Sequence, residues 1–472
     1  MSEWLLKGGR VIDPAMERDE IADVHIADGA IAAIGPSLNG SGAELIDAQG
    51  TVVAPGFVDL HTHLREPGRE DEETIATASA AAAAGGYTGI CAMPNTDPVC
   101  DTSSVAEKVW ALGREVGLVD VRVAGALSRG LNGAVMADIG EMARSAARVT
   151  MFTDDGHGVQ DSLFARRTME YLVAFDAIYA EHCEDAALAA GGQMHEGDRS
   201  AALGLRGIPA EAEELMAARD IALAKLTGCR LHLLHISTAG TVELLRRARA
   251  EGARITAEAT PHHFTLTDAA LETYDPLMKV NPPLRSQKDV DAVIQGLADG
   301  TIDAIATDHA PHAVEEKDQE FGYAPPGMLG LETALALGLT QLVEPGHLDL
   351  TTLIEVLSTR PARILGLDSQ GSLDGGSAAN LVVFDPAARW SVDASSLQSK
   401  SRNTPFHDRE VSGRVMHTFF EGRPTVLDGK VLSGATSDRL DDRAKDKRGD
   451  RLDDRAKDKR GDRLDDRAKE SV

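Results

Sequence analysis

Two histidines, His61 and His63, close an apolar and β-prone run that covers residues 54–60. Strand side chains alternate between faces, so residues at positions i and i+2 point the same way. Two neutral imidazoles side by side at a strand end can chelate one cation, and zinc is the usual candidate. Because His-x-His pairs are common by chance, this pair needs further ligands elsewhere in the chain.

Other candidate ligands follow other predicted strands. Asp154 and Asp155 follow the strand predicted at 148–152, His182 follows 177–181, and Asp308 follows 303–307. Each has an ordinary alternative explanation as a turn residue, a helix cap or a polar strand residue. Taken together, they supply nitrogen and oxygen ligands suited to one or two zinc ions.

The strand predicted at 231–236 carries two histidines, His232 and His235. Alternation places residues three apart on opposite faces of a strand, so we expect only one of them to point inward. His235 lies nearer the end of the strand and is the better candidate ligand. We expect His232 to face a layer of helices.

Alternating segments in the middle of the chain, residues 55–368, position these ligands. Short β-branched runs there are followed by Ala-rich stretches such as 74–84 and 210–226. This order predicts an α/β protein, specifically a (β/α)8 TIM-like barrel. The carboxyl ends of the strands build the active site in barrels of this kind.

Both ends of the chain are predicted to form short strands. Residues 4–14 have the pattern strand, turn, strand, and residues 23–35 predict a hairpin with an Asp-Gly turn. Similar strands return at 379–385 and 426–431. We therefore predict one small β-sandwich domain built from residues 1–54 and 369–432.

The last forty residues, 433–472, contain a charged repeat. Residues 438–449 recur as 450–461 and then in part. One Leu and one Ala in each repeat cannot bury a core, so we expect a disordered tail. A charged helix stabilised by i, i+4 ion pairs is the alternative.

Composition excludes several functional classes. A formal charge of −27 over 472 residues argues against binding to nucleic acid or to anionic membranes. No apolar run reaches the roughly 18 residues needed to span a bilayer, and the first residues lack a basic segment. Four scattered cysteines indicate reduced thiols, so we expect a cytoplasmic enzyme. An acidic protein that binds an anionic substrate needs local arginines.

Six motifs together resemble the long, bacterial-type (class I) dihydroorotases of the amidohydrolase superfamily. They are 61–68 (HTHLREPG), 93–96 (MPNT), 152–156 (FTDDG), 182–185 (HCED), 279–285 (KVNPPLR) and 307–312 (TDHAPH). The resemblance covers about residues 1–432. It implies the reversible, zinc-dependent cyclisation of N-carbamoyl-L-aspartate to L-dihydroorotate plus water, in de novo pyrimidine (UMP) biosynthesis. It also implies one or two zinc ions per subunit.

The resemblance assigns roles to individual positions. The implied metal ligands are His61, His63, Asp155, His182, His235 and Asp308, with Asp155 bridging and Asp308 also carrying protons. The implied substrate contacts are His63, Arg65, Asn95, Asn281, His312, Pro326 and Gly327. Arg65 follows the strand end within reach of the pocket, where a guanidinium can hold a carboxylate through two hydrogen bonds.

Two rival functions stay open. A related allantoinase or hydantoinase shares the barrel, but many such relatives carry a carboxylated lysine at the bridging position, and residues 152–156 contain no lysine. A non-catalytic, dihydroorotase-like partner of aspartate transcarbamoylase lacks metal ligands, whereas all six positions are filled here. We expect a homo-oligomer that binds a small-molecule substrate, and an association with that transcarbamoylase stays open.

Some polar residues near these motifs have no assigned role. The spacing of His157, His262 and His263 gives no argument for a specific function. The long polar stretch 310–327 follows the last ligand strand, and long loops over a barrel mouth often act as lids. We predict a mobile loop there that closes on the substrate.

Overall fold

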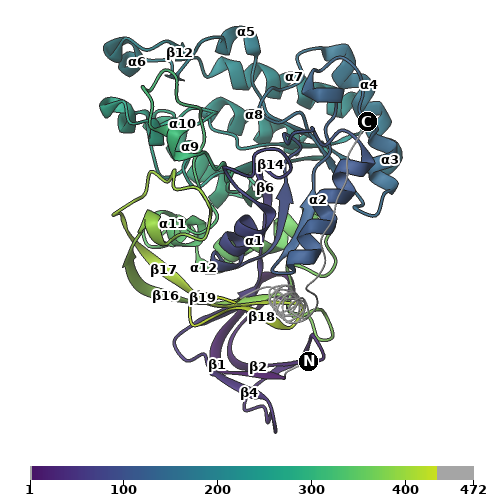
Figure 1. The fold of residues 1–472 in the computed structure, drawn as a ribbon, viewed down its shortest axis with the longest axis vertical. Coiled ribbons are helices and arrows are strands. Elements are labelled where there is room, and N and C mark those ends of the chain that lie inside the picture. Colours follow the sequence, from purple (N-terminus) through teal and green to yellow (C-terminus); the bar gives the residue numbers. More distant parts are fainter. Residues whose placement is uncertain (1–2, 433–472) are drawn as a thin grey trace, which may run out of the picture. The chain divides into compact units, whose positions relative to one another are not determined.

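The computed structural model describes residues 3–432, which belong to one compact unit (Figure 1). The predicted tail, residues 433–472, lies outside the described residues. Among the described residues, no helix combines the length and the apolar character needed to cross a membrane.

Strands from both terminal segments form one mixed sheet of nine strands. The first segment supplies β1 (Trp4–Asp13), β2 (Arg18–Ala27), β3 (Ala30–Gly35), β4 (Glu44–Asp47) and β5 (Val52–Pro55). The last segment supplies β16 (Leu381–Ser391), β17 (Glu410–Phe420), β18 (Arg423–Leu427) and β19 (Lys430–Val431). The order is β19-β18-β17-β16-β5-β1-β2-β3, with β4 also paired to β1. Both termini therefore build one β unit, as predicted.

Two details of this sheet differ from the sequence prediction. The antiparallel pairing of β16 with β5 joins the two terminal segments edge to edge, so the strands form one sheet and not a sandwich of two separate sheets. Residues 4–13 form the single strand β1, and an irregularity between Leu6 and Gly9 replaces the expected turn. Such a bulge absorbs an extra residue without ending the strand.

The predicted hairpin is confirmed. β2 pairs antiparallel with β3 across Asp28 and Gly29, which have φ of 51° and 83°. Two consecutive positive φ values give the tight turn that matches the twist of the flanking strands. Apolar side chains from both terminal segments pack together in the core of this sheet, including Trp4, Val24, Val53, Val383 and Phe419.

Eight parallel strands occupy the middle of the chain. The first sheet contains β6 (Phe57–Thr62), β7 (Tyr87–Ala92) and β8 (Asp120–Val123). The second contains β9 (Met151–Phe152), β10 (Ile178–Glu181), β13 (Arg230–Leu233), β14 (Ile255–Ala259) and β15 (Ala304–Ile305). Single parallel bridges, Gly125 to Phe152 and Thr62 to His309, join the two sheets at both edges.

Helices alternate with these strands. They are α1 (Ile75–Ala84), α2 (Ser103–Val116), α3 (Ile139–Arg144), α4 (Ser162–Leu172), α5 (Ala186–Ala189), α6 (Asp198–Leu203), α7 (Glu211–Thr227), α8 (Ala239–Ala250), α9 (Gln287–Ala298), α10 (Val314–Lys317), α11 (Ala334–Gly338), α12 (Leu350–Ile354) and α13 (Arg360–Leu365). Short strands β11 (Met194–His195) and β12 (Gly207–Ile208) pair with each other. The helices predicted at 74–84 and 210–226 correspond to α1 and α7 within one residue.

Local sequence explains how α1 begins. The Thr74 hydroxyl accepts a hydrogen bond from the backbone N–H of Thr77, and the Thr77 hydroxyl accepts one from the N–H of Thr74. This reciprocal cap satisfies two backbone donors that the first turn leaves free. The alanines of α1 are mostly buried and allow close packing beside α2 and β7. The segment between β6 and α1 is thereby fixed at both ends.

Candidate metal centre and substrate pocket

The six predicted ligands lie together, and all are buried. Each lies at or just after the carboxyl end of a parallel strand: His61 on β6 and His63 after it, Asp155 after β9, His182 after β10, His235 after β13, and Asp308 after β15. Because the strands are parallel, their carboxyl ends lie at the same end of the two sheets. The fold therefore assembles residues that are up to 247 positions apart in sequence.

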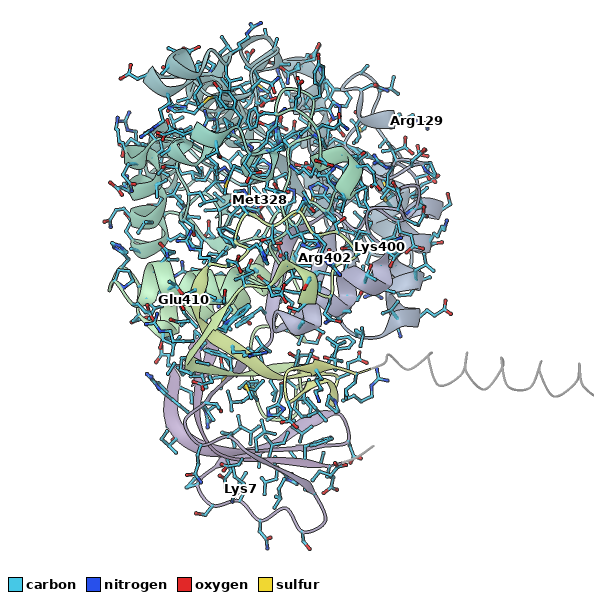
Figure 2. The ribbon with its side chains drawn as sticks, turned by 60° about the vertical axis from the view of Figure 1, so that its left-hand side comes forward. Lys7, Arg129, Met328, Lys400, Arg402 and Glu410 are labelled. Atoms are coloured by element: carbon cyan, nitrogen blue, oxygen red, sulfur yellow. The ribbon has the colours of Figure 1, made fainter. Side chains whose placement is uncertain are left out.

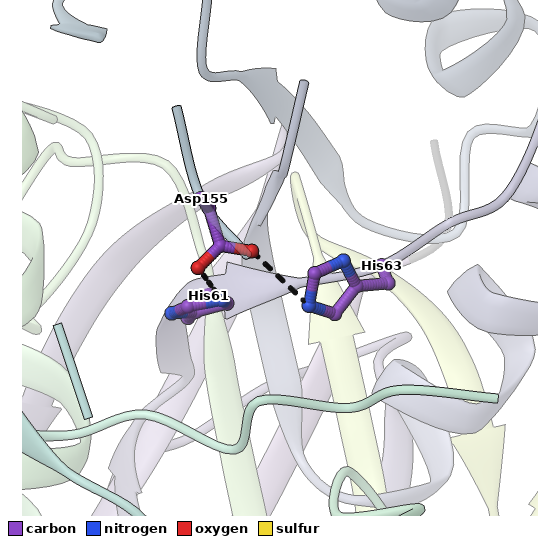
Figure 3. A group of neighbouring side chains, drawn as sticks. All are labelled: His61, His63 and Asp155. Carbon is purple, nitrogen blue, oxygen red and sulfur yellow. Dashed lines mark ion pairs between the residues drawn. The ribbon is translucent and has the colours of Figure 1, made fainter. Parts of the chain in front are cut away.

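Asp155 lies between two groups of histidines. Its Oδ1 is 3.5 Å from Nε2 of His61, and its Oδ2 is 3.6 Å from Nε2 of His63 (Figure 3). On the other side, Oδ1 is 3.6 Å from Nδ1 of His182 and 3.4 Å from Nε2 of His235. In each group the potential ligand atoms all lie within 4.8 Å of one another. This arrangement suits two cations that share one carboxylate.

Asp308 completes the first group. Its Oδ1 is 2.9 Å from Nε2 of His63 and 3.5 Å from Nε2 of His61. Burial alone would raise the pKa of Asp308, but the charges and hydrogen bonds of His61 and His63 hold it below the ordinary value. The carboxylate is therefore ionised at neutral pH.

The cluster fits a metal ion. His61 Nε2 and Asp155 Oδ1 are buried and have no hydrogen-bond partner among the described residues. Buried polar atoms without partners are costly, and in native proteins they usually meet water or an ion. Four imidazoles and two carboxylates are also a donor set that zinc prefers.

Neighbouring side chains orient the imidazole rings. Oε1 of Glu258 lies 2.9 Å from Nδ1 of His61, and Oδ1 of Asn95 lies 2.9 Å from Nδ1 of His63. A proton on each Nδ1 satisfies these contacts and leaves each Nε2 lone pair directed at the cluster. The amide nitrogen of Asn281 lies 3.3 Å from Nε2 of His182, and the other nitrogen of that ring, Nδ1, faces Asp155.

The prediction for His232 is wrong. Its Nε2 lies 3.0 Å from Oε2 of Glu258, the same carboxylate that contacts His61, so His232 points to the inside of the strand layer. β13 ends at Leu233, and His235 has a φ of 29°. Strand alternation therefore stops before His235, and both histidines can face inward.

Glu258 and Asp59 are functional candidates that sequence reasoning missed. Oδ1 of Asp59 accepts hydrogen bonds from the backbone N–H groups of His61 at 3.0 Å and Thr307 at 3.1 Å, which fixes β6 beside the end of β15. Burial raises the pKa of Asp59 to about 7. Burial would raise the pKa of Glu258, but His232 and His61 lower it to about 2. A carboxylate inside an apolar strand was the available sequence signal for both.

A cavity of about 200 Å³ opens over the cluster. All seven predicted substrate contacts line it: His63, Arg65, Asn95, Asn281, His312, Pro326 and Gly327. Asp155, His182, His235 and Asp308 line it as well. The candidate ligands and the candidate substrate contacts therefore share one cavity.

Arg65 occupies one wall of this cavity. Its backbone is left-handed, with a φ of 62°, and its Nε donates a hydrogen bond to the carbonyl oxygen of Pro311 at 3.0 Å. Its two terminal nitrogens donate no hydrogen bond to the described residues. They are available for a carboxylate in the cavity.

Residues 310–327, called the roof segment below, contribute Ala310, His312, Pro325, Pro326 and Gly327 to the cavity wall. Lys317 is 6% exposed, and its Nζ donates to the carbonyl oxygens of Pro325 at 2.8 Å and Pro276 at 3.0 Å. Asn403 contributes from the chain between β16 and β17, donating to the carbonyls of Ala310 and Gly327 at 2.9 and 3.2 Å. Figure 2 labels Arg402, which precedes Asn403 in the sequence, and Met328, which follows the roof segment in the sequence.

Three further histidines keep no assigned role. His157 is exposed. Nδ1 of His263 lies 2.7 Å from the Thr260 hydroxyl, and Nε2 lies 3.0 Å from the Pro282 carbonyl oxygen. Both ring nitrogens therefore contact groups of the surrounding protein, which indicates a structural role. His262 is buried, and burial followed by the charge of His263 holds its pKa well below the usual value.

Comparison with known structures identifies the class of protein. The chain superimposes on the L-hydantoinase (dihydropyrimidinase) from Arthrobacter aurescens with a TM-score of 0.83 and 29% identity, over 92% of this chain and 98% of the other. The D-hydantoinase from Thermus sp. gives 0.77 and 26%, over 91% and 96%. The fold is that of these amidohydrolases.

Sequence comparison narrows the assignment. The Dihydro-orotase-like family matches residues 50–241. The chain is 49% identical to the dihydroorotase of Streptomyces coelicolor, over 91% of this chain and 100% of that protein. It is 50% identical to the dihydroorotase of Mycobacterium tuberculosis, over 87% and 96%. The chain belongs to the dihydroorotase family, which confirms the resemblance found in its motifs.

Proposed function

We propose that this protein is a dihydroorotase that interconverts N-carbamoyl-L-aspartate and L-dihydroorotate in pyrimidine biosynthesis. The observation that carries the proposal is the shared cavity, which is lined both by Asp155, a member of both groups of possible ligands, and by Arg65, whose terminal nitrogens face no partner among residues 3–432. Both substrates carry a carboxylate that a guanidinium can bind. The relatives from Streptomyces coelicolor and Mycobacterium tuberculosis are both named dihydroorotase.

We propose that the eight parallel strands close into a (β/α)8 barrel over residues 55–368. The two single bridges that join the edges of the sheets support this closure. The nine-stranded sheet from residues 1–54 and 369–432 would then be the small β domain. These domain limits remain predictions.

We propose zinc as the metal, with one ion held by His61, His63 and Asp308 and a second by His182 and His235. Asp155 would bridge the two. Bound zinc polarises a carbonyl group and lowers the pKa of water to about 7. Glu258, Asn95 and Asn281 would act behind these ligands by fixing the ring orientations.

The chain's own residues provide binding and proton transfer. Arg65 and the amide nitrogen of Asn95 would hold the substrate carboxylate, while Asn281, His312 and the backbone at Pro326 and Gly327 would bound the ring. In the hydrolytic direction Asp308 would take the proton of the attacking water and pass it to the leaving ring nitrogen. In the cyclisation direction it would remove a proton from the ureido nitrogen.

The two rival functions, a hydantoinase or allantoinase and a non-catalytic partner, have less support. The hydantoinases from Arthrobacter aurescens and Thermus sp. are 29% and 26% identical to this chain, whereas the dihydroorotases of Streptomyces coelicolor and Mycobacterium tuberculosis are 49% and 50% identical. All six ligand positions are filled and grouped, which does not suit a non-catalytic partner. All four cysteines are free and buried, which supports a cytoplasmic location. A homo-oligomeric state and an association with aspartate transcarbamoylase remain predictions.

The test is the zinc content of the purified protein, measured together with turnover of L-dihydroorotate, hydantoin and allantoin. We expect one or two zinc ions per chain and activity selective for dihydroorotate, lost on chelation and restored by zinc. Selective turnover of hydantoin or allantoin would contradict the substrate assignment. Absence of both metal and activity would favour the non-catalytic partner.

A further inference from the structure

Glu72, in the segment between β6 and α1, contacts two residues of the substrate pocket at once. Its side chain is 1% exposed. Oε2 lies 3.0 Å from Nε of Arg65, and Oε1 lies 3.1 Å from Nδ1 of His312 in the roof segment. No other carboxylate among residues 3–432 is paired with both.

We propose that Glu72 is the positioning residue for the substrate carboxylate, acting through Arg65 and His312. This inference rests on the proposed function, because it assumes that these two residues bind the substrate. Glu72 does not line the cavity itself. It acts by orienting the side chains of Arg65 and His312, which do line the cavity, and by balancing the charge of Arg65.

The contacts of Nε determine how the guanidinium group of Arg65 is oriented. Nε donates its hydrogen bond to the Pro311 carbonyl and forms an ion pair with Oε2 of Glu72 at 3.0 Å, so the two terminal nitrogens remain for a ligand. A planar fork that is already oriented loses little side-chain entropy when it binds a carboxylate.

Glu72 orients His312 in a similar way. Nδ1 of His312 lies 3.1 Å from Oε1 of Glu72, and the other nitrogen of the ring, Nε2, lies 3.0 Å from the carbonyl oxygen of Pro326 in the cavity wall. Oε2 of Glu316 also lies 3.1 Å from Nδ1, which ties the ring to α10. The roof segment is thereby held to the segment that carries Arg65.

Charge balance gives a second reason for a carboxylate at this position. Arg65 and Arg69 are both close to Glu72, with Arg69 Nη2 at 2.9 Å from Oε1. The side chain of Arg65 is 12% exposed and that of Glu72 is 1% exposed, so this ion pair lies largely out of the solvent. Removing the carboxylate would leave a buried guanidinium beside a second cation, which is costly.

A metal site at this cluster is a less suitable interpretation. Glu72, His312 and Glu316 could hold an ion by distance alone. However, Nη2 of Arg69 contacts both carboxylates, at 2.9 Å from Glu72 and 2.6 Å from Glu316. The negative charge is already matched by arginines.

The test compares steady-state kinetics of the zinc-loaded wild type with Glu72→Gln, Arg65→Ala and the double variant. We expect Glu72→Gln to raise KM for L-dihydroorotate about tenfold or more, with kcat changed less than about threefold. In the Arg65→Ala background the same substitution should have a much smaller effect, because the two act through one contact. Asp71→Asn is the matched control, since Asp71 is 66% exposed and, within residues 3–432, is paired only with Arg69, at 3.7 Å.

Several outcomes would overturn the proposal. These are an unchanged KM in Glu72→Gln, a loss confined to kcat, or equal effects in the two backgrounds. If Glu72→Gln does not fold, Glu72→Asp keeps the charge with a shorter reach and should raise KM to a smaller extent. Calorimetric binding of N-carbamoyl-L-aspartate separates the two hypotheses: binding without turnover in the wild type contradicts only the catalytic assignment, and no binding contradicts both.

Discussion

Glu258 and His61 are 197 residues apart in sequence, yet Oε1 of Glu258 lies 2.9 Å from Nδ1 of His61. The other oxygen of the carboxylate contacts His232, and all three side chains are fully buried. An ionised carboxylate here fixes which nitrogen of His61 carries the proton. It would also make that ring a better ligand for a metal ion, because hydrogen bonding to a carboxylate raises ligand basicity.

We therefore expect Glu258→Gln to lower zinc affinity by about 10- to 100-fold. The amide keeps the size of the side chain but loses the charge that holds the His61 proton. Competition with a chelator of known affinity, followed by metal analysis, measures the change. Zinc retention equal to that of the wild type would show that Glu258 serves packing only.

Removal of the proton carrier should affect the chemical step. Asp308→Ala should fold, because the side chain lies in the cavity wall, and its turnover should fall by at least about 10²–10⁴-fold. Circular dichroism confirms folding, and progress curves with L-dihydroorotate measure turnover. Near-normal kcat would refute the assignment of Asp308 to proton transfer.

The roof segment requires glycine at position 327. Gly327 has a φ of 139°, and a Cβ there would lie 2.8 Å from Nε2 of His312 and 2.9 Å from Cβ of Ala310. Gly327→Ala should therefore displace His312, raise KM and destabilise the protein by about 1–3 kcal/mol. Gly322→Ala is the matched control in the same segment, because nothing lies within 4 Å of its added Cβ. Equal KM values for both variants would contradict this role.

Lys317 predicts a pH dependence of stability. Burial, followed by the charge of Lys279, lowers its pKa to about 7 from 10.5, while Asp275 and Glu316 oppose the shift. Between these values the unfolded chain binds more protons, so this group makes stability rise with pH from about 7 to 10.5, by up to about 1.4 kcal/mol per pH unit.

Lys317→Met should remove that contribution. Urea unfolding of both proteins at several pH values gives the difference in free energy of unfolding. We expect the difference, wild type minus variant, to increase as the pH rises through this window. A difference that is constant with pH would show that the lysine has the same pKa in the folded and unfolded chains.

The proposed lid movement of the roof segment has its own measurement. The segment is anchored by Lys317 and Asn403, so opening must break several buried hydrogen bonds. Limited proteolysis with and without N-carbamoyl-L-aspartate should show protection by the ligand. Cleavage that is unaffected by the ligand would contradict a lid.

Sequence reasoning succeeded where the signal was local. The Asp28-Gly29 hairpin and the helices α1 and α7 follow from turn residues, caps and composition over a few positions. The positions of His61, His63 and Asp308 at strand ends followed from the same reasoning. The continuous strand β1 was missed because a bulge and a turn use similar residues, and only pairing with β2 distinguishes them.

By itself, the sequence determined the family, the set of candidate ligands and the candidate residues of the substrate cavity. These could be read from short motifs, because a motif is recognised from the identity and spacing of neighbouring residues. Tertiary structure decided which side chains stand behind them. Glu258 behind His61, Asp59 between two strands and Glu72 between Arg65 and His312 are contacts across 7 to 248 positions. The prediction for His232 assumed that strand alternation continues to His235. It failed because the backbone leaves strand geometry at His235, and the packing around that residue determines this geometry.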